Sequence, residues 1–343
     1  MIDIKLLEQL CLCNGISGDE GNVRNLIINE IKDCADDIKT DNLGNLIVFK
    51  KGKKSAKSKL MVSAHMDEVG LMVTDITSDG YLKFDEVGGI DRRVLPGKRV
   101  CVGRNGLNGV IGVKPIHLTN GDEKTAVPKM NDMYIDIGAE SREDALKYVN
   151  YGDGINFEGD FKINGKTVVT KALDDRFGCY VLINLIKSEP EYDMYFTFVV
   201  QEEVGLRGAR PAAFTVNPDF ALVIESTTAA DVAEVDASHQ VCNLSKGATV
   251  AVMDRATVYD KEMISAAFEL AEKNNIAVQY KRAVAGGNDS GAIHQSRGGV
   301  RTLAVSLPSR YIHAPSTAAN LDDCESVLKL AKVLSDYICL LYT

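Results

Sequence analysis

Three absences narrow the classes of protein that this sequence can encode. No apolar run approaches the roughly 18 residues that a membrane span requires, which argues against a membrane protein. The start, Met1-Ile2-Asp3-Ile4-Lys5, is charged early and lacks an apolar signal core, so we expect a cytoplasmic protein. The eight cysteines include no Cys-x-x-Cys pair, which fits reduced thiols better than a disulfide framework or a thiolate zinc site.

Tryptophan and an excess of positive charge are also missing. Sugar-binding grooves typically use aromatic platforms, so the lack of tryptophan argues against a glycosidase. A formal net charge of −9 argues against nucleic acid as an electrostatic partner. What remains is an ordinary globular composition, with 45% hydrophobic and 25% charged residues in a chain of 343. Such a chain is long enough for one large core and a smaller domain.

Strands alternate with helices in both end regions of the chain. Apolar strands are predicted at 45–50, 59–64, 167–173, 194–200, 220–224 and 301–307, and helices at 3–13, 260–273 and about 322–342. This alternation predicts an α/β fold with a mixed, largely parallel sheet between layers of helices. In such sheets, ligands bind beyond the carboxyl ends of the strands.

The pattern changes between residues 71 and 165. Short alternating segments are separated there by turn sequences such as Asp79-Gly80 and Pro96-Gly97, and only residues 142–149 look helical. We therefore expect residues 71–165 to form a small β-rich domain, a barrel or a sandwich. It would be inserted into a larger domain formed by residues 1–70 and 166–343.

One predicted strand end carries two adjacent carboxylates. The apolar run at 194–200 leads directly into Gln201-Glu202-Glu203-Val204-Gly205. Neighbouring carboxylates repel each other unless they share a cation or one of them holds a proton. One glutamate could therefore bind a metal while the other moves a proton, although the pair alone could also belong to a solvated loop.

Other metal-competent side chains occupy equivalent positions. His65 follows a strand, and Asp67 projects to the same side of an extended chain, where it could hold the second ring nitrogen of the histidine. Asp174 follows another strand, although it could instead cap the next helix. Glu225 ends a third strand, and His313 lies on a loop after a fourth. Their shared position predicts one common site.

Histidines and carboxylates without a thiolate suit zinc, cobalt or manganese. A single zinc ion needs about three protein ligands, so the larger number here predicts two divalent metal ions that share a bridging carboxylate. Such a pair generates hydroxide near neutral pH and polarises a carbonyl oxygen. A nearby unligated glutamate could then pass the proton of the water to a leaving amine, which predicts hydrolysis of an amide bond.

Five motifs together resemble the M42 family of co-catalytic metallo-aminopeptidases, the glutamyl- and leucyl-type enzymes that form tetrahedral assemblies. They follow the family order across nearly the whole chain: His65-Met66-Asp67, Ala172-Leu173-Asp174-Asp175-Arg176, Gln201-Glu202-Glu203-Val204-Gly205, Gly286-Gly287-Asn288-Asp289 and Tyr311-Ile312-His313-Ala314. The resemblance implies a zinc-peptidase-like fold with a PDZ-like or barrel-like inserted domain. It also implies a homo-oligomer, either a dodecamer or a dimer.

The resemblance implies a set of metal ligands as well. Asp174 would bridge both ions, His65 and Glu225 would complete one site, and Glu203 and His313 would complete the other. Glu225 departs from several family members, which have the shorter aspartate there.

The remaining site residues receive roles in the same way. Glu202 would be the general base, and Asp67 would orient the histidine at position 65. The peptide bond between Asp174 and Asp175 would be cis. Asp231 is a candidate contact for the free amine of the substrate, or else an ordinary loop carboxylate.

The sequence therefore predicts a metal-dependent aminopeptidase that acts on short peptides and has no nucleic-acid or membrane partner. The alternatives are an N-acyl amino acid deacylase or carboxypeptidase-like amidohydrolase, an endoglucanase, and a non-enzymatic scaffold. An aminopeptidase requires a free α-amine, whereas a deacylase takes N-acyl amino acids, so the two substrate types distinguish the first two hydrolases.

Overall fold

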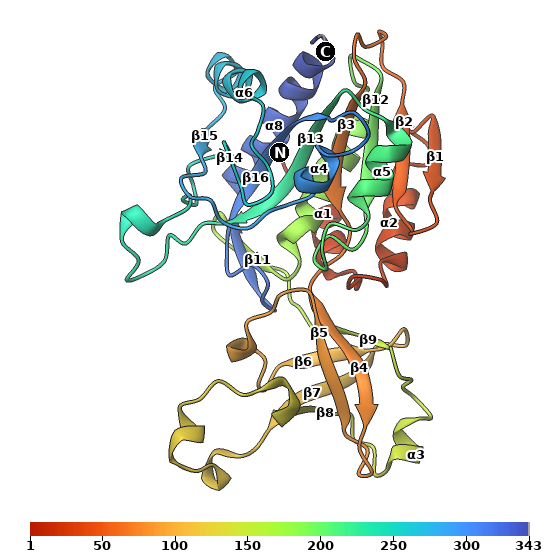
Figure 1. The fold of residues 1–343 in the computed structure, drawn as a ribbon, viewed down its shortest axis with the longest axis vertical. Helices are drawn as coiled ribbons and strands as arrows, with labels where there is room; N and C mark the ends of the chain where they lie inside the picture. The colour runs from red at the N-terminus through yellow and green to blue at the C-terminus, as the bar shows by residue number, and fades with distance from the viewer. Residues whose placement is uncertain (342–343) are drawn as a thin grey trace.

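The computed structural model describes residues 1–341 of the protein. Figure 1 shows a large α/β part at the top and a smaller barrel below it. The chain enters the barrel after β3 (Leu60–His65) and returns to the large part at β10 (Lys162–Asn164). His65 therefore lies at the point where the chain leaves the large part.

The large part is built on a mixed eleven-stranded sheet, which confirms the predicted fold class. Its other strands are β1 (Asp37–Thr40), β2 (Leu46–Lys50), β11 (Thr167–Thr170), β12 (Met194–Val199), β13 (Phe220–Thr228), β14 (Ala248–Val250), β15 (Val278–Tyr280), β16 (Arg301–Arg310) and β17 (Thr317–Asn320). The main order is β1-β2-β12-β3-β13-β16-β17-β11-β10, with β14 and β15 beside β16.

Parallel pairing is concentrated at the centre of this sheet. Strands β12, β3, β13 and β16 run parallel to one another, and β14 is parallel to β15. The pairs on either side of these strands are antiparallel: β1–β2, β2–β12, β16–β17, β17–β11 and β11–β10. The carboxyl ends of the four central strands therefore meet at one edge, where ligands bind in sheets of this kind.

Helices cover both faces of the central strands. They are α1 (Ile4–Leu12), α2 (Gly21–Ile31), α4 (Leu173–Lys187), α5 (Ala209–Val216), α6 (Lys261–Lys273), α7 (Ser290–Ile293) and α8 (Leu321–Ile338). Helices α4 and α8 pack together on one face, and α5 and α7 pack together on the other (Figure 1). Every residue of β3 is buried because both faces are covered. None of the described helices is both long and apolar enough to cross a membrane.

Two predicted helices end earlier than expected. The helix predicted at 322–342 is α8, which ends at Ile338, and the predicted end at Tyr342 lies outside the described residues. The helix predicted at 142–149 is α3, Arg142–Ala145, which begins as expected at a Ser141 cap but spans only four residues.

The smaller part is a closed antiparallel barrel with the strand order β4-β5-β8-β7-β6-β9. The strands are β4 (Gly70–Ile76), β5 (Leu82–Val87), β6 (Arg99–Val102), β7 (Leu107–Val113), β8 (Met133–Asp136) and β9 (Gly154–Phe157). Its buried apolar residues form a core separate from that of the large sheet. Strand β10 lies inside the range 71–165 but pairs with β11 of the large sheet. We therefore propose that the inserted domain ends before β10.

Candidate metal centre

One cavity at the carboxyl ends of the central strands brings together six of the predicted site residues. The cavity is partly open to solvent, and its space, including that open part, amounts to about 560 Å³. The six residues are His65, Asp174, Glu202, Glu203, Glu225 and His313. His65 ends β3, Asp174 lies at the start of α4, the two adjacent glutamates follow β12, and His313 follows β16. Glu225 was predicted to end its strand, but β13 continues past it to Thr228. No cysteine lies among the described residues that line it.

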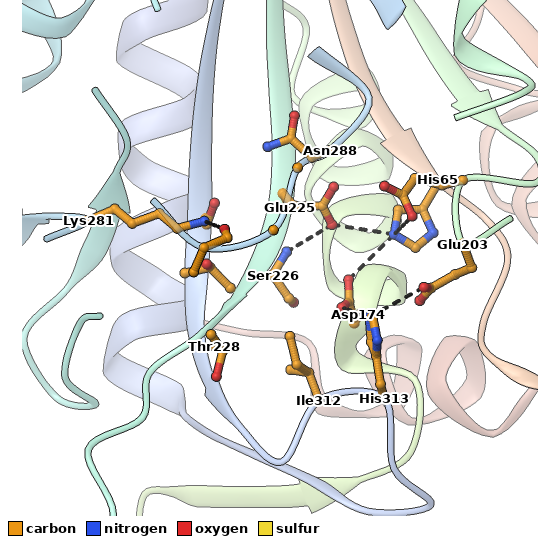
Figure 2. A pocket seen from close by; sticks show the side chains of 16 residues that line it. His65, Asp174, Glu203, Glu225, Ser226, Thr228, Lys281, Asn288, Ile312 and His313 are labelled. Atoms are coloured by element: carbon orange, nitrogen blue, oxygen red, sulfur yellow. Dashed lines mark hydrogen bonds and ion pairs between the residues drawn. The ribbon is translucent and has the colours of Figure 1, made fainter. Parts of the chain in front are cut away.

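The carboxylate of Asp174 lies between two histidines (Figure 2). Its Oδ1 is 3.4 Å from Nε2 of His65, and its Oδ2 is 3.5 Å from Nε2 of His313. Each histidine also faces a glutamate, because Nε2 of His65 is 3.3 Å from Oε1 of Glu225 and Nε2 of His313 is 3.3 Å from Oε2 of Glu203. Asp174 is thus common to two groups of potential ligands.

Three groups of side chains in this cavity have ligand atoms within 4.8 Å of one another: His65–Asp174–Glu225, Asp174–Glu203–His313 and His65–Glu202–Glu203. The first two share only Asp174. Each combines one imidazole nitrogen with carboxylate oxygens, a donor set that suits zinc and other divalent transition metals. These side chains therefore form candidate metal-binding groups.

The backbone around Asp174 departs from regular helix. The peptide bond between Asp174 and Asp175 is cis, as the family resemblance implies. Both residues have non-helical backbone angles, so the regular part of α4 begins after them. Asp175 provides the cap, since its Oδ1 accepts the backbone N–H of Gly178 at 2.9 Å. The capping role considered for Asp174 belongs to its neighbour, which leaves the Asp174 side chain facing the cavity.

The two adjacent glutamates both face the cavity because the chain turns just before them. Strand β12 ends at Val199, and Gln201 adopts the left-handed conformation with φ of 57°. The carboxylate of Asp67 holds this turn: Oδ1 accepts the backbone N–H of Glu202 at 3.0 Å, and Oδ2 accepts that of Glu203 at 3.1 Å. Neighbours on a regular strand would point in opposite directions.

Asp67 contacts His65 as well, but mainly through its backbone. Nδ1 of His65 is 3.0 Å from the carbonyl oxygen of Asp67 and 3.5 Å from its Oδ1. A hydrogen bond donated by Nδ1 leaves the lone pair on Nε2, the nitrogen that faces Asp174 and Glu225. The carboxylate of Asp67, predicted to orient the histidine, has closer partners in the Glu202–Glu203 turn and in the Ser17 hydroxyl, which donates at 2.6 Å.

Burial, with smaller contributions from neighbouring charges, raises the pKa values of the glutamates of this cavity. Burial, with the charge of Asp174 adding to it, raises the pKa of Glu203 to about 8. Burial outweighs the attraction of His65 and raises the pKa of Glu225 to about 7. Burial also raises the pKa of Glu202 well above its usual range. Burial alone would lower the pKa of His313, but its hydrogen bond to Asp174 and the charge of Glu203 raise it to about 9.

Comparison with known sequences identifies the family. The family model described as M42 glutamyl aminopeptidase matches residues 44–330. The chain belongs to the M42 family. It is 43% identical over 336 residues to a candidate aminopeptidase of Acetivibrio thermocellus, covering 97% of this chain and 98% of that relative. It is 34% identical to the lysyl aminopeptidase of Pyrococcus furiosus, with 97% of both chains covered. The predicted family is thereby confirmed.

Solved structures agree with this M42 assignment. A TET aminopeptidase from a marine sediment Thaumarchaeota archaeon superposes with a TM-score of 0.92 at 33% identity, covering 96% of this chain and 95% of that one. A TET peptidase of Pyrococcus horikoshii, which can assemble into a tetrahedron or a large octahedral shell, gives 0.85 at 38% identity with 99% of both chains covered. A Thermotoga maritima structure named endoglucanase gives 0.81 at 38% identity, with 97% of both covered.

Asp231 lies outside the cavity that brings together the six predicted site residues. Its Oδ1 accepts from Nε of Arg310 at 2.7 Å, and its Oδ2 accepts from Nη2 of Arg310 and from the backbone N–H of Leu244, both at 2.9 Å. The side chain does not line the cavity. This arrangement fits the loop carboxylate considered for Asp231 and gives no support to the predicted contact with a substrate amine.

A buried ion network behind the cavity was not predicted. Arg176 is fully buried and donates to the backbone carbonyls of Leu10, Gly15 and Met66. It also contacts Oε1 of Glu68 at 3.2 Å, and Nζ of Lys171 lies 2.8 Å from the same oxygen. Arg176 belongs to the Asp174 motif, and Glu68 follows the His65 motif. In the sequence, only their closeness to these two motifs indicates that Arg176 and Glu68 lie near the site.

A polar wall opposite His65 was also missed. Lys281, Thr228 and Ser226 line the cavity there (Figure 2). The glycine-rich turn at 286–289 completes this wall through Asn288, whose Nδ2 donates to the Tyr259 hydroxyl at 3.0 Å. Ser226 and Thr228 lie on β13 beyond the predicted end of that strand, and Lys281 follows the three-residue β15. Asn288 belongs to the glycine-rich motif, but that motif alone does not show which cavity wall it forms.

Proposed function

We propose that this M42 protein is a metal-dependent aminopeptidase that removes N-terminal residues from short peptides. The observation that carries the proposal is the position of Asp174 between His65 and His313, each of which faces its own glutamate. The cofactors would be two divalent metal ions per subunit, with zinc or cobalt favoured by the imidazole and carboxylate donors and manganese also compatible.

The residues of the cavity fit two such ions. One would be held by His65, Asp174 and Glu225, and the other by Asp174, Glu203 and His313. Support comes from the crowding of buried carboxylates, because burial and then mutual repulsion raise the pKa values of Glu203 and Glu225, and a bound cation would favour their charged forms. When bound, the ions would lower the pKa of a water molecule and polarise the carbonyl group of the scissile bond.

Glu202 is the general base in this proposal. It is nearly buried, its Oε2 lies 4.0 Å from Nε2 of His65, and it belongs to neither of the two groups that share Asp174. Glu202 takes a proton from the attacking water as the new C–O bond forms. It then returns that proton to the amine nitrogen as the C–N bond breaks. A carboxyl group whose pKa is raised by burial suits both transfers.

We further propose that the protein acts in the cytoplasm as a homo-oligomer, a dodecamer or a dimer. All eight of its cysteines are free, which fits a reducing compartment. The tetrahedral and octahedral assemblies of the Pyrococcus horikoshii relative support self-association. The partners would be short peptides, with no nucleic-acid or membrane partner.

The decisive experiment compares blocked and unblocked substrates on protein of known metal content. We expect cleavage of aminoacyl anilides with a free amine, no cleavage of their N-acetyl counterparts, loss of activity with a chelator and recovery with zinc or cobalt. Preferential hydrolysis of N-acyl amino acids would identify a deacylase, and hydrolysis of a β-glucan an endoglucanase. Activity that persists after verified metal removal would disprove the metal-dependent mechanism.

A further inference from the structure

Residues 15–20, the connecting segment between α1 and α2, pack directly against the inserted barrel. Helix α2 lies at the end of the large part that faces the barrel (Figure 1). Ile16 is fully buried, and a Cβ atom on Gly70 would lie 2.2 Å from its Cγ2, while one on Gly154 would lie 3.0 Å from its Cδ1. These two glycines begin β4 and β9, so the isoleucine contacts the backbone of two barrel strands.

The connecting segment also contacts the turn at residues 201–203, which carries the two adjacent glutamates. The Ser17 hydroxyl donates to Oδ2 of Asp67 at 2.6 Å, and Asp67 in turn holds this turn. Glu20 reaches the turn directly, because its Oε1 accepts the backbone N–H of Gln201 at 3.2 Å. One short segment thus lies between the barrel and the backbone of the proposed general base.

The side chain of Glu20 is directed at this turn and not at its own helix. Glu20 immediately precedes α2, but it makes no capping hydrogen bond to the first turn of that helix, all of which the structure describes. Its Oε1 instead accepts the backbone N–H of Gly18 at 2.6 Å as well as that of Gln201, and the residue is only 4% exposed. Together with Asp67, buried carboxylates from two separate segments accept the three successive backbone N–H groups of residues 201–203.

We propose that Glu20 is a positioning residue for Glu202, and that the connecting segment makes turnover depend on how the barrel is seated. The backbone N–H of Asp19 donates to the carbonyl oxygen of Ile16 at 2.9 Å, so the segment is a compact turn that carries a displacement at the barrel to position 20. A general base must lie within hydrogen-bond reach of the attacking water, and small displacements cost much of its effect. The effect on turnover rests on the proposed aminopeptidase function.

The first test removes the hydrogen-bond acceptor at position 20 and keeps its volume. Glu20→Met should lower kcat for an unblocked aminoacyl anilide about 10-fold, because the backbone N–H of Gln201 loses a charged acceptor. KM and metal content should change less than about twofold, since Asp67 still holds the N–H of Glu203. Glu20→Gln should keep most of the activity, because its amide oxygen can accept both N–H groups that now share one carboxylate oxygen.

A matched control removes a glutamate from the other end of the same helix. Glu30 lies near the end of α2 and pairs with the partly exposed Lys187. Glu30→Met should leave kcat, KM and metal content unchanged. Thermal stability, measured for every variant, identifies any that fails to fold.

A double variant distinguishes action through Glu202 from a general weakening of the fold. If Glu20 acts by positioning Glu202, a protein that already lacks the base has little more to lose. Glu20→Met should therefore lower kcat less than about twofold in the Glu202→Gln protein, against about 10-fold in the unaltered one. Single-turnover kinetics at high enzyme concentration measure the low rates of these variants.

Hydrogen exchange follows the turn without any substrate. The backbone N–H groups of residues 201–203 should exchange about 10-fold faster in zinc-loaded Glu20→Met than in the zinc-loaded unaltered protein. Ile16→Ala, at the barrel end of the segment, should speed the same exchange and lower kcat. Ile16→Val keeps the Cγ2 atom that meets Gly70 and should have a smaller effect. The Ile16 variants also provide the test if Glu20→Met does not fold.

Three results would overturn this assignment. Unchanged kcat and exchange in Glu20→Met would show that the turn does not depend on position 20. An equal fall in kcat with and without Glu202 would mean that Glu20 acts through another residue. Unchanged exchange of residues 201–203 in Ile16→Ala would show that the barrel contact is not transmitted. Failure of the unaltered protein to cleave any unblocked substrate would instead disprove the proposed function, and the exchange rates would still decide whether Glu20 holds the turn.

Discussion

The backbone N–H of Glu202 donates a hydrogen bond to Oδ1 of Asp67 at 3.0 Å, although 135 positions separate the two residues in the sequence. The bond joins the exits of β3 and β12, which are neighbours in the sheet. One buried carboxylate thus fixes the turn that carries the proposed general base and lies beside the histidine at position 65. The position of Glu202 therefore depends on Asp67.

Removing the hydrogen bonds accepted by the Asp67 carboxylate should reduce kcat, and the reduction should increase with the number of bonds lost. Asp67→Asn places an amide where two backbone N–H groups and the Ser17 hydroxyl now meet a carboxylate, so we expect kcat to fall about 10- to 100-fold. Ser17→Ala removes only the hydroxyl donor and should cost about fivefold. Both are measured with an unblocked aminoacyl anilide on metal-quantified protein. Full activity in Asp67→Asn would show that the turn before Glu202 and Glu203 keeps its conformation without the Asp67 carboxylate.

Glu202→Gln should separate proton transfer from metal binding. The amide cannot accept the proton of the water, so kcat should fall about 10²- to 10⁴-fold while metal content stays nearly intact. His313→Ala removes a proposed ligand and should lower metal content together with activity. Atomic absorption and kinetics on the same samples test both. Retention of most activity in Glu202→Gln would refute the general-base role.

The strand ends of the site could be predicted from the sequence because each closes a visible apolar run. His65 and the Glu202–Glu203 pair follow such runs at the ends of β3 and β12, and parallel strands bring their carboxyl ends to one edge. Glu225 also follows an apolar run, but β13 continues beyond it to Thr228. The backbone details could not be predicted in this way. The left-handed Gln201 and the cap formed by Asp175 depend on contacts with distant segments.

Contacts between residues far apart in the sequence also could not be predicted. Nothing near Asp231 in the sequence indicates its bidentate pairing with Arg310, which lies 79 positions away. Lys281 follows a three-residue strand whose pattern is too short to show which side chain faces the cavity. Its position becomes visible only when β14, β15 and β16 are seen together.

Metal affinity should increase as the pH rises from about 6 to 9. Ligands bind metal ions in their deprotonated form. In the metal-free protein the pKa is about 7 for Glu225, about 8 for Glu203 and about 9 for His313. Below these values the ion must displace protons, and above them it need not. Calorimetry in buffers of different ionisation enthalpy should detect proton release on zinc binding at neutral pH, which declines as the pH rises. The absence of release at neutral pH would contradict these pKa values.

Arg176→Met should strongly destabilise the metal-free protein. The guanidinium group is fully buried and holds the end of α1 through the carbonyl of Leu10 and the following loop through that of Gly15. Its loss would also remove a partner of Glu68. Removing one member of a buried ion pair costs about 3–5 kcal/mol, and Lys171 should keep the loss near the lower end because it still pairs with that glutamate. Urea denaturation measures the change. The matched control is Arg93→Met, which removes an exposed guanidinium paired with Asp91 and should leave the unfolding midpoint unchanged. A midpoint for Arg176→Met equal to that of the control would mean that other contacts hold this loop against the exit of β3.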